Sequence, residues 1–265
     1  MKIIHRIVFR PDKTQRRVLQ EIGIPVPPNE DLPVFEFDEE HEKLISLKPY
    51  IDKWQLVDNV RTEFTKKELD AASFLRWFPL WMNGYPMPDD DFGYIGTTFQ
   101  KQGYCEVCGS GLVQQSSFRL RKAPNWGSKK IFGLNWVYDE VFVRKDVYET
   151  VFKKYGIESM PVLLYKKDVI IEDTVQLIIP TTDAYSNLEE QPYEICKTCG
   201  MKRYNPKTKG FFPSFKDSVT GLHLFKGREW FGSGAMSYKQ IFVSQELRQE
   251  MIKYQIKSDF DPVNQ

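Results

Sequence analysis

Two copies of the pentapeptide pattern Cys-x-x-Cys-Gly constrain this chain more than any other feature. The first copy runs from Cys105 to Gly109 and the second from Cys196 to Gly200, and together they hold all 4 cysteines of the 265-residue chain. Two thiolates separated by two residues can hold one tetrahedral metal ion from a tight turn, and the glycine lets the backbone fold back beneath it. Two such turns, here called the first and second knuckle, supply the ligands of a closed structural zinc site.

The context of these cysteines favours metal over other thiol chemistry. Charges interrupt the short apolar run at the start of the chain, and no apolar segment is long enough to span a membrane, so we expect a cytoplasmic protein without a membrane partner. Thiols persist in a reducing cytosol, which favours a metal over two local disulfides. Redox catalysis requires a pair at a helix N-terminus, and the flanking sequences lack the strand that would precede such a helix.

The composition argues against binding to nucleic acid or membranes through net charge, and the sequence lacks two common catalytic motifs. Apolar residues make up 41% and charged residues 28%, as in ordinary globular proteins, and a net charge of +1 creates no field that would attract nucleic acid or an anionic membrane. There is neither a phosphate-binding Walker loop nor a nucleophile elbow. The three histidines are dispersed, and His223 is the best catalytic candidate among them. We therefore expect a protein that is not an enzyme.

The N-terminal part reads as a mixture of helices and strands. Residues 3–10 resemble a strand, and Asp12 with Gln15 predicts a capped helix through Ile22. The capping box Thr65-Lys66-Lys67-Glu68 predicts another helix. That helix would carry Leu69, Ala72, Leu75 and Trp77 on its apolar face. A loop rich in proline and aspartate follows, which places a domain boundary near residue 100 and separates region 1–100 from region 101–265.

The C-terminal region is predicted to contain an internal duplication. A hydrophobic strand at 141–143 leads into an amphipathic helix, and a similar strand at 241–243 leads into a second one. Each copy follows a knuckle and closes on a Pro-Val pair. The expected fold class is therefore α+β, with an N-terminal mixed region followed by repeats at about 105–162 and 196–263.

The predicted duplication suggests how the two knuckles could share one metal ion. The stretch between Cys108 and Cys196 is too long for a simple zinc ribbon. If the two halves pack about a pseudo-twofold axis, equivalent turns can meet on that axis and share one ion, which would fix the placement of the halves. The expected zinc ligands are Cys105, Cys108, Cys196 and Cys199.

Two basic stretches with interleaved aromatic residues follow the knuckles and support an alternative function. Zinc-ribbon proteins often bind nucleic acid through such loops, with bases stacked on aromatic rings and phosphates held by cations. Solvated loops whose charge offsets the thiolates are the other interpretation. In the nucleic-acid alternative, the contacting residues would be Arg119, Arg121, Lys202 and Arg203.

The doubled CxxCG, the segment Ile241–Leu247 and the terminal Phe260-Asp261-Pro262-Val263 together resemble the bacterial double-CXXCG proteins. Some of these are counted among immunity proteins that neutralise polymorphic toxins. The resemblance covers roughly residues 100–265. It implies that the four cysteines are metal ligands, that no residue is catalytic and that the partner is a cognate toxin protein. Val107 and Thr198 stand where such turns often have proline.

Overall fold

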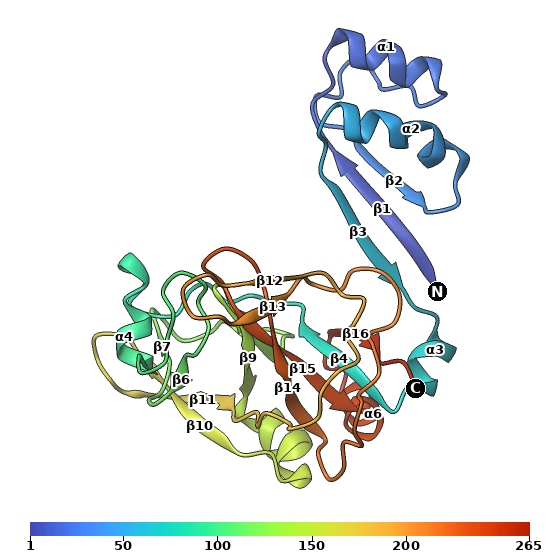
Figure 1. The fold of residues 1–265 in the computed structure, drawn as a ribbon. Helices are drawn as coiled ribbons and strands as arrows, with labels where there is room; N and C mark the ends of the chain where they lie inside the picture. Colours follow the sequence, from blue (N-terminus) through green and yellow to red (C-terminus); the bar gives the residue numbers. More distant parts are fainter. The chain divides into compact units, whose positions relative to one another are not determined.

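The computed structural model describes all of residues 1–265, and the chain is a mixed α+β protein that divides into two compact units (Figure 1). The first unit comprises Met1–Glu68 and Lys207–Gly210, and the second comprises Leu69–Pro206 and Phe211–Gln265. The boundary expected near residue 100 falls inside the second unit, because strand β4 (Phe74–Pro79) is paired on both sides within its six-stranded sheet. None of the helices has the length and apolar character that crossing a membrane requires.

The first unit is a three-stranded sheet covered by two helices. Strand β1 (Lys2–Val8) lies in the middle and pairs antiparallel with β2 (Val34–Asp38) and β3 (Asp58–Glu63). Helices α1 (Lys13–Glu21) and α2 (Glu42–Lys53) share one hydrophobic core with the sheet. The strand and the helix predicted first are both present, and α1 begins at the expected Asp12–Gln15 capping box.

The helix predicted to follow Thr65 is much shorter than expected. The capping box forms, since the Thr65 amide donates to the Glu68 carboxylate over 2.8 Å, but α3 ends at Ala71 (Lys66–Ala71). The segment that contains Leu75 and Trp77 is strand β4 instead. Its aromatic residues suit a strand, and hydrogen bonding to a neighbour on each side outweighs the helical spacing of its apolar residues.

The second unit contains two larger sheets. One has five strands in the order β7-β10-β11-β9-β8, the other has six in the order β12-β13-β14-β15-β4-β16, and β5 with β6 forms a small ribbon. The strands of the five-stranded sheet and the ribbon are β5 (Phe99–Gln100), β6 (Val113–Gln114), β7 (Arg119–Leu120), β8 (Ile131–Leu134), β9 (Val137–Arg144), β10 (Ser159–Leu164) and β11 (Ile170–Leu177). The remaining strands are β12 (Tyr193–Ile195), β13 (Lys202–Tyr204), β14 (Leu224–Phe231), β15 (Tyr238–Ser244) and β16 (Ser258–Pro262).

Four strands in each of the two sheets share one arrangement, whereas the additional strands β7 and β12–β13 lie at opposite ends of it. In the first, hairpin β8–β9 leads through a helical segment to β10, and β11 lies between β9 and β10. In the second, hairpin β14–β15 leads through α6 (Gln245–Lys253) to β16, and β4 occupies the central place. The registers correspond as well: Val143 pairs with Val175 in one sheet, and Val243 pairs with Leu75 in the other.

The helical segments of the two arrangements differ by one residue. The chain from Val143 to Ile157 is one residue longer than the chain from Val243 to Ile256. The longer segment consists of α5 (Lys145–Val147), a π-helical turn η2 (Tyr148–Phe152) and the 3-10 turn η3 (Lys153–Tyr155), whereas α6 is a regular helix. A π-helical turn takes up the additional residue, because its hydrogen bonds span five residues rather than four.

Both helical segments pack into a single hydrophobic core. Val147 and Val151 from the first arrangement lie in the same cluster as Leu247 and Met251 from the second. Outside this core, the ring centroids of Tyr138 and Tyr238 are 5.5 Å apart, so strands β9 and β15 lie next to each other. The shorter helical elements η1 (Asp90–Phe92) and α4 (Tyr94–Thr98) precede the first knuckle.

Candidate metal centre

The first knuckle is a tight turn closed by two backbone hydrogen bonds. The amide of Gly109 donates to the carbonyl of Cys105 over 2.7 Å, and the amide of Cys105 donates to the carbonyl of Ser110 over 2.9 Å. Gly109 has φ of +76°, and a Cβ added there would lie 2.4 Å from the carbonyl oxygen of Ala235. Both the backbone conformation and the surrounding space therefore require glycine at this position.

The second knuckle repeats this turn with the same hydrogen bonds. The amide of Gly200 donates to the carbonyl of Cys196 over 2.9 Å, and the amide of Cys196 donates to the carbonyl of Met201 over 2.9 Å. Gly200 has φ of +74°, but no atom lies within 4 Å of an added Cβ. This turn leads directly into strand β13, so the six-stranded sheet positions its thiols.

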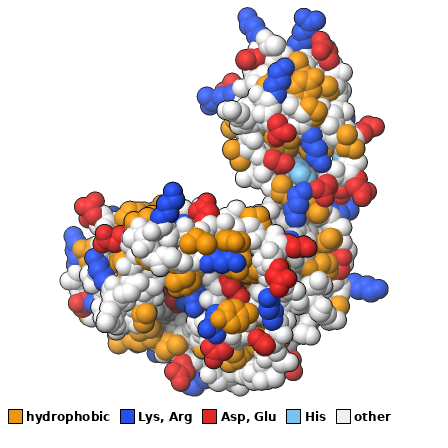
Figure 2. Space-filling model, in the orientation of Figure 1, with side chains coloured by type: hydrophobic (Ala, Val, Ile, Leu, Met, Phe, Trp, Pro, Cys, Tyr) orange, Lys and Arg blue, Asp and Glu red, His pale blue; other side chains and the backbone are white.

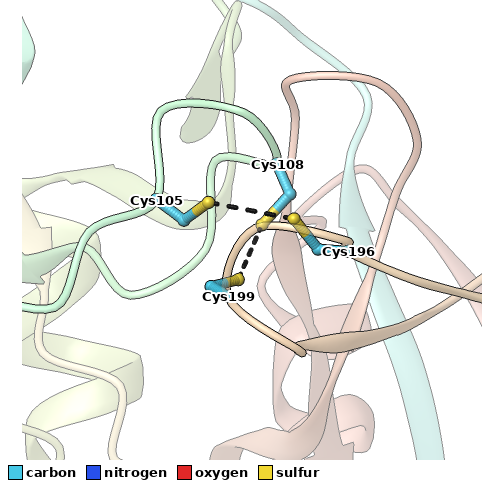
Figure 3. A group of neighbouring side chains, drawn as sticks. All are labelled: Cys105, Cys108, Cys196 and Cys199. Carbon is cyan, nitrogen blue, oxygen red and sulfur yellow. Dashed lines mark hydrogen bonds between the residues drawn. The ribbon is translucent and has the colours of Figure 1, made fainter.

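The two knuckles meet, and their four thiols form one cluster (Figure 3). Equivalent cysteines face each other: Sγ of Cys105 lies 3.9 Å from Sγ of Cys196, and Sγ of Cys108 lies 3.6 Å from Sγ of Cys199. All four sulfurs lie within 4.8 Å of one another, and all four cysteines are free thiols. A zinc ion with Zn–S bonds of about 2.3 Å separates its sulfur ligands by about 3.8 Å. The cluster therefore fits a tetrahedral metal ion, and the predicted convergence of the two pairs is confirmed.

The thiols of the cluster differ in acidity. Although a backbone hydrogen bond from Cys108 lowers it, the pKa of Cys105 is raised to about 11 by burial and a hydrogen bond with Cys199, whereas Cys196 is ionised at neutral pH. Backbone amides of Cys199 and Thr198 lower the pKa of the Cys196 thiol to about 6, because they donate hydrogen bonds that stabilise its ionised form. The hydroxyl oxygen of Ser110 lies 3.0 Å from Sγ of Cys108, within reach to donate to a thiolate there. Since metal ions bind the thiolate and displace the thiol proton, these groups prepare the cluster for a metal ion.

Arg203, in strand β13 of the six-stranded sheet, supports the first knuckle through hydrogen bonds. Only 4% of its surface is exposed. Its Nη1 donates to the carbonyls of Cys108 at 3.0 Å and Gly234 at 2.7 Å. The hydroxyl of Ser237 donates to the same Cys108 carbonyl over 2.6 Å. Metal sites commonly depend on such partners behind the ligands, and the buried guanidinium also places positive charge beside the thiolates. Because Arg203 is buried, it is not available to a nucleic-acid phosphate as the alternative function requires.

The other three cations of that alternative have partners within the chain. Arg119 lies 2.7 Å from the carboxylate of Asp168, and Arg121 lies 2.8 Å from the carboxylate of Asp89. The ammonium group of Lys202 lies 3.8 Å from the ring centroid of Tyr193. On the face shown in Figure 2, basic and acidic side chains are interspersed on the surface of the second unit. The basic stretches seen in the sequence therefore do not add up to a phosphate-binding patch on that face.

His223 lies near a serine and a glutamate without forming a catalytic triad. Its Nδ1 is 2.9 Å from Oγ of Ser244 and 3.5 Å from a carboxylate oxygen of Glu246. In a triad, histidine joins the nucleophile and the carboxylate through its two different ring nitrogens. Here Ser244 and Glu246 both lie near the same ring nitrogen, Nδ1. Ser244 is the N-cap of α6, and its hydroxyl oxygen accepts a hydrogen bond from the amide of Leu247 over 3.2 Å.

Comparison of the chain with protein-family models, with curated proteins and with solved structures finds no match. The class of the protein therefore follows from its own geometry. It is an α+β protein in which two CxxCG turns, 91 positions apart, bring together four cysteines that can hold a metal ion. Arg203 and Ser237 are supporting residues that the sequence motif did not identify, since their roles depend on distant parts of the chain. Ser110, which directly follows the first knuckle, supports Cys108 locally.

Proposed function

We propose that this protein is a cytoplasmic, non-enzymatic zinc protein whose four-cysteine centre is structural. The single observation that carries the proposal is the spacing of the sulfurs, which matches the edges of a zinc tetrathiolate. A catalytic zinc keeps one coordination position for water or substrate, whereas four cysteine ligands fill a tetrahedral ion. Bound zinc would cross-link two segments that are far apart in the sequence and stabilise their placement.

The proposal includes the duplication of the knuckle, strand and helix units. Its support is the correspondence of two independent features. Four strands of each sheet have the same spatial order and register, and the knuckles have the same backbone hydrogen bonds. Equivalent aromatic pairs also recur: Phe132 stacks on Phe142 at 5.0 Å, and Phe225 stacks on Phe242 at 5.5 Å. One shared ion between two copies follows from this relation.

The zinc content of the purified protein tests the proposed four-cysteine centre. Protein purified under reducing conditions without chelator should contain about one zinc per chain, as one closed tetrahedral site requires. Replacement of the zinc by cobalt should produce the intense visible absorption of a tetrahedral thiolate complex. Cys105→Ser should remove the metal and most of this absorption. Two zinc ions per chain, or none in the reduced protein, would contradict the shared centre.

We further propose that the protein is an immunity-type protein that binds and neutralises a cognate bacterial toxin. The resemblance to double-CXXCG proteins supports this, and so do two exposed aliphatic side chains beside the cysteines. Val107 in the first knuckle is 60% exposed, and Ile195 directly before the second knuckle is 59% exposed. Apolar groups of this kind are suited to the buried centre of a protein interface.

A toxin encoded beside the gene offers the test of this function. We expect its product to co-purify with this protein, and we expect expression of the protein to rescue cells from the toxin. Val107→Asp should weaken the complex at least tenfold while the zinc content stays at about one, because the side chain points away from the ligand set and into solvent. Ile45→Asp, at an equally exposed aliphatic residue (59%) of the first unit, is the control. Full protection by Val107→Asp would contradict the proposed surface, and no binding by the native protein would contradict the toxin-binding function.

A further inference from the structure

A cavity of about 490 Å³ adjoins the first knuckle and is lined by aromatic rings. Phe92, Tyr94, Tyr104 and Trp136 contribute to its wall, and the knuckle itself contributes Glu106. The ring centroid of Trp136 lies 4.6 Å from that of Phe92 and 6.2 Å from that of Tyr94. Three of the rings therefore form one continuous aromatic surface around Trp136.

Two of the residues that carry these rings have an unusual backbone conformation. Phe92 has φ of +54°, its neighbour Asp91 has φ of +47°, and Trp136 has φ of +69°. Positive φ is rare for residues other than glycine, asparagine and aspartate, and it costs about 1–3 kcal/mol for each residue. Such conformations are concentrated at ligand-binding and catalytic sites, where surrounding structure maintains them. Of the seven residues other than glycine with positive φ, three line this cavity, and two of these carry rings of its aromatic wall.

The charges around the cavity favour a cation. The carboxylates of Asp91 and Glu106 line it, and Lys101 is the single basic residue in the wall. The thiolates of the metal centre add negative charge behind the first knuckle, to which Glu106 belongs. A cation over the face of an aromatic ring is attracted by the ring quadrupole, most strongly when water is excluded. Aromatic rings combined with carboxylates are the chemistry that recognises substituted ammonium groups.

We propose that this cavity is a binding site for a substituted ammonium group, such as a quaternary or N-methylated amine. Rings of Phe92, Tyr94 and Trp136 would contact the methyl groups, and the carboxylates of Asp91 and Glu106 would balance the charge. The inference does not depend on toxin binding, since it rests on the wall of the cavity alone. It assigns the strained residues a role that the metal centre does not need.

Calorimetric titration of the full chain with choline chloride tests the site. We expect saturable binding, and we expect the neutral isostere 3,3-dimethylbutan-1-ol to bind at least tenfold more weakly, because it has the same shape without the charge. Equal binding of the two compounds, or no saturable binding of choline, would overturn the proposal. A peptide containing trimethyl-lysine, titrated in parallel, distinguishes a free amine from one carried by a protein.

Two matched variants locate the binding. Phe92→Leu should weaken choline binding about tenfold, whereas Tyr85→Leu should leave it within twofold. Both side chains contact Trp136, with centroids at 4.6 Å and 4.4 Å, but Tyr85 does not line the cavity. Equal effects of the two variants would place the binding elsewhere. Should Phe92→Leu unfold the protein, Phe92→Tyr retains a ring and should bind normally, and Glu106→Gln should then show the loss of affinity.

Discussion

The two knuckles have the same sequence pattern and the same backbone hydrogen bonds, yet they lie in different surroundings. In the first, Cys108 is fully buried and Gly109 lies against the backbone of Ala235. In the second, Cys199 is exposed and Gly200 faces open space. The motif therefore specifies the shape of a turn, while the packing around it determines how much a substitution costs. Four predictions test this difference, beginning with the largest effect.

Loss of a ligand should affect the first knuckle most. Cys108→Ser and Cys199→Ser should both abolish zinc binding, but only the first also changes a fully buried side chain. We expect Cys108→Ser to lower the free energy of unfolding by more than about 4 kcal/mol, since it removes a metal and alters the core. Urea unfolding measures both variants. In excess chelator, Cys199→Ser should become as stable as the native protein while Cys108→Ser remains less stable, and identical curves for the two variants would refute the distinction.

Arg203 and Lys202 are adjacent in strand β13 and provide the second comparison. Arg203→Met removes the donor to the Gly234 carbonyl and one of the two donors to the buried Cys108 carbonyl, which also accepts from Ser237, and this should cost about 2–4 kcal/mol. Lys202→Met changes an exposed side chain and should cost less than about 1 kcal/mol. Chemical unfolding with zinc present measures both, and zinc should dissociate faster from Arg203→Met. Similar stabilities would show that the guanidinium does not support the knuckle.

The two knuckle glycines, Gly109 and Gly200, provide the third comparison. Gly200→Ala should cost about 1–2 kcal/mol, which is the strain of a left-handed residue with a Cβ. Gly109→Ala should cost more, because the added methyl would also lie 2.4 Å from the Ala235 carbonyl and force the backbone to shift. Thermal unfolding of the zinc-loaded variants should reveal this order. The reverse order would mean that the first knuckle is less closely packed than the structure shows.

The smallest effect concerns ionisation in the metal-free protein. The pKa of the Cys196 thiol is lowered from its ordinary value of 9.0 to about 6 by backbone hydrogen bonds. Between these values the folded chain binds fewer protons than the unfolded chain, so this thiolate contributes stability that is complete above pH 9 and is lost as the pH falls through 6. Thiolate absorbance in the ultraviolet should show a step near pH 6 that disappears in Cys196→Ser. A first step near pH 9 would contradict the role of the amides.

Sequence reasoning worked best where the structure is local. The capping boxes at Asp12 and Thr65, the strand–helix pairs after Val141 and Ile241 and the two knuckles are set by residues only a few positions apart. Capping hydrogen bonds and tight turns depend on neighbouring side chains, so their signals are visible in a short window. The meeting of the knuckles was also predicted, but only because the repeated pattern suggested equivalent positions in two halves.

Other features depended on segments that come together only in the folded chain. Trp77 fits a helical pattern after Thr65, but strands β15 and β16 provide hydrogen-bonding partners on both sides and make its segment a strand. Arg203 stands in a basic stretch of sequence, but distant carbonyls bury it beside the metal centre. The sequence by itself determined the turns, the caps and the four thiols, because these arise from local geometry and chemical type. The tertiary structure decided which strand completes each sheet and which charges are buried, because hydrogen bonding and desolvation depend on neighbours that the order of residues does not identify.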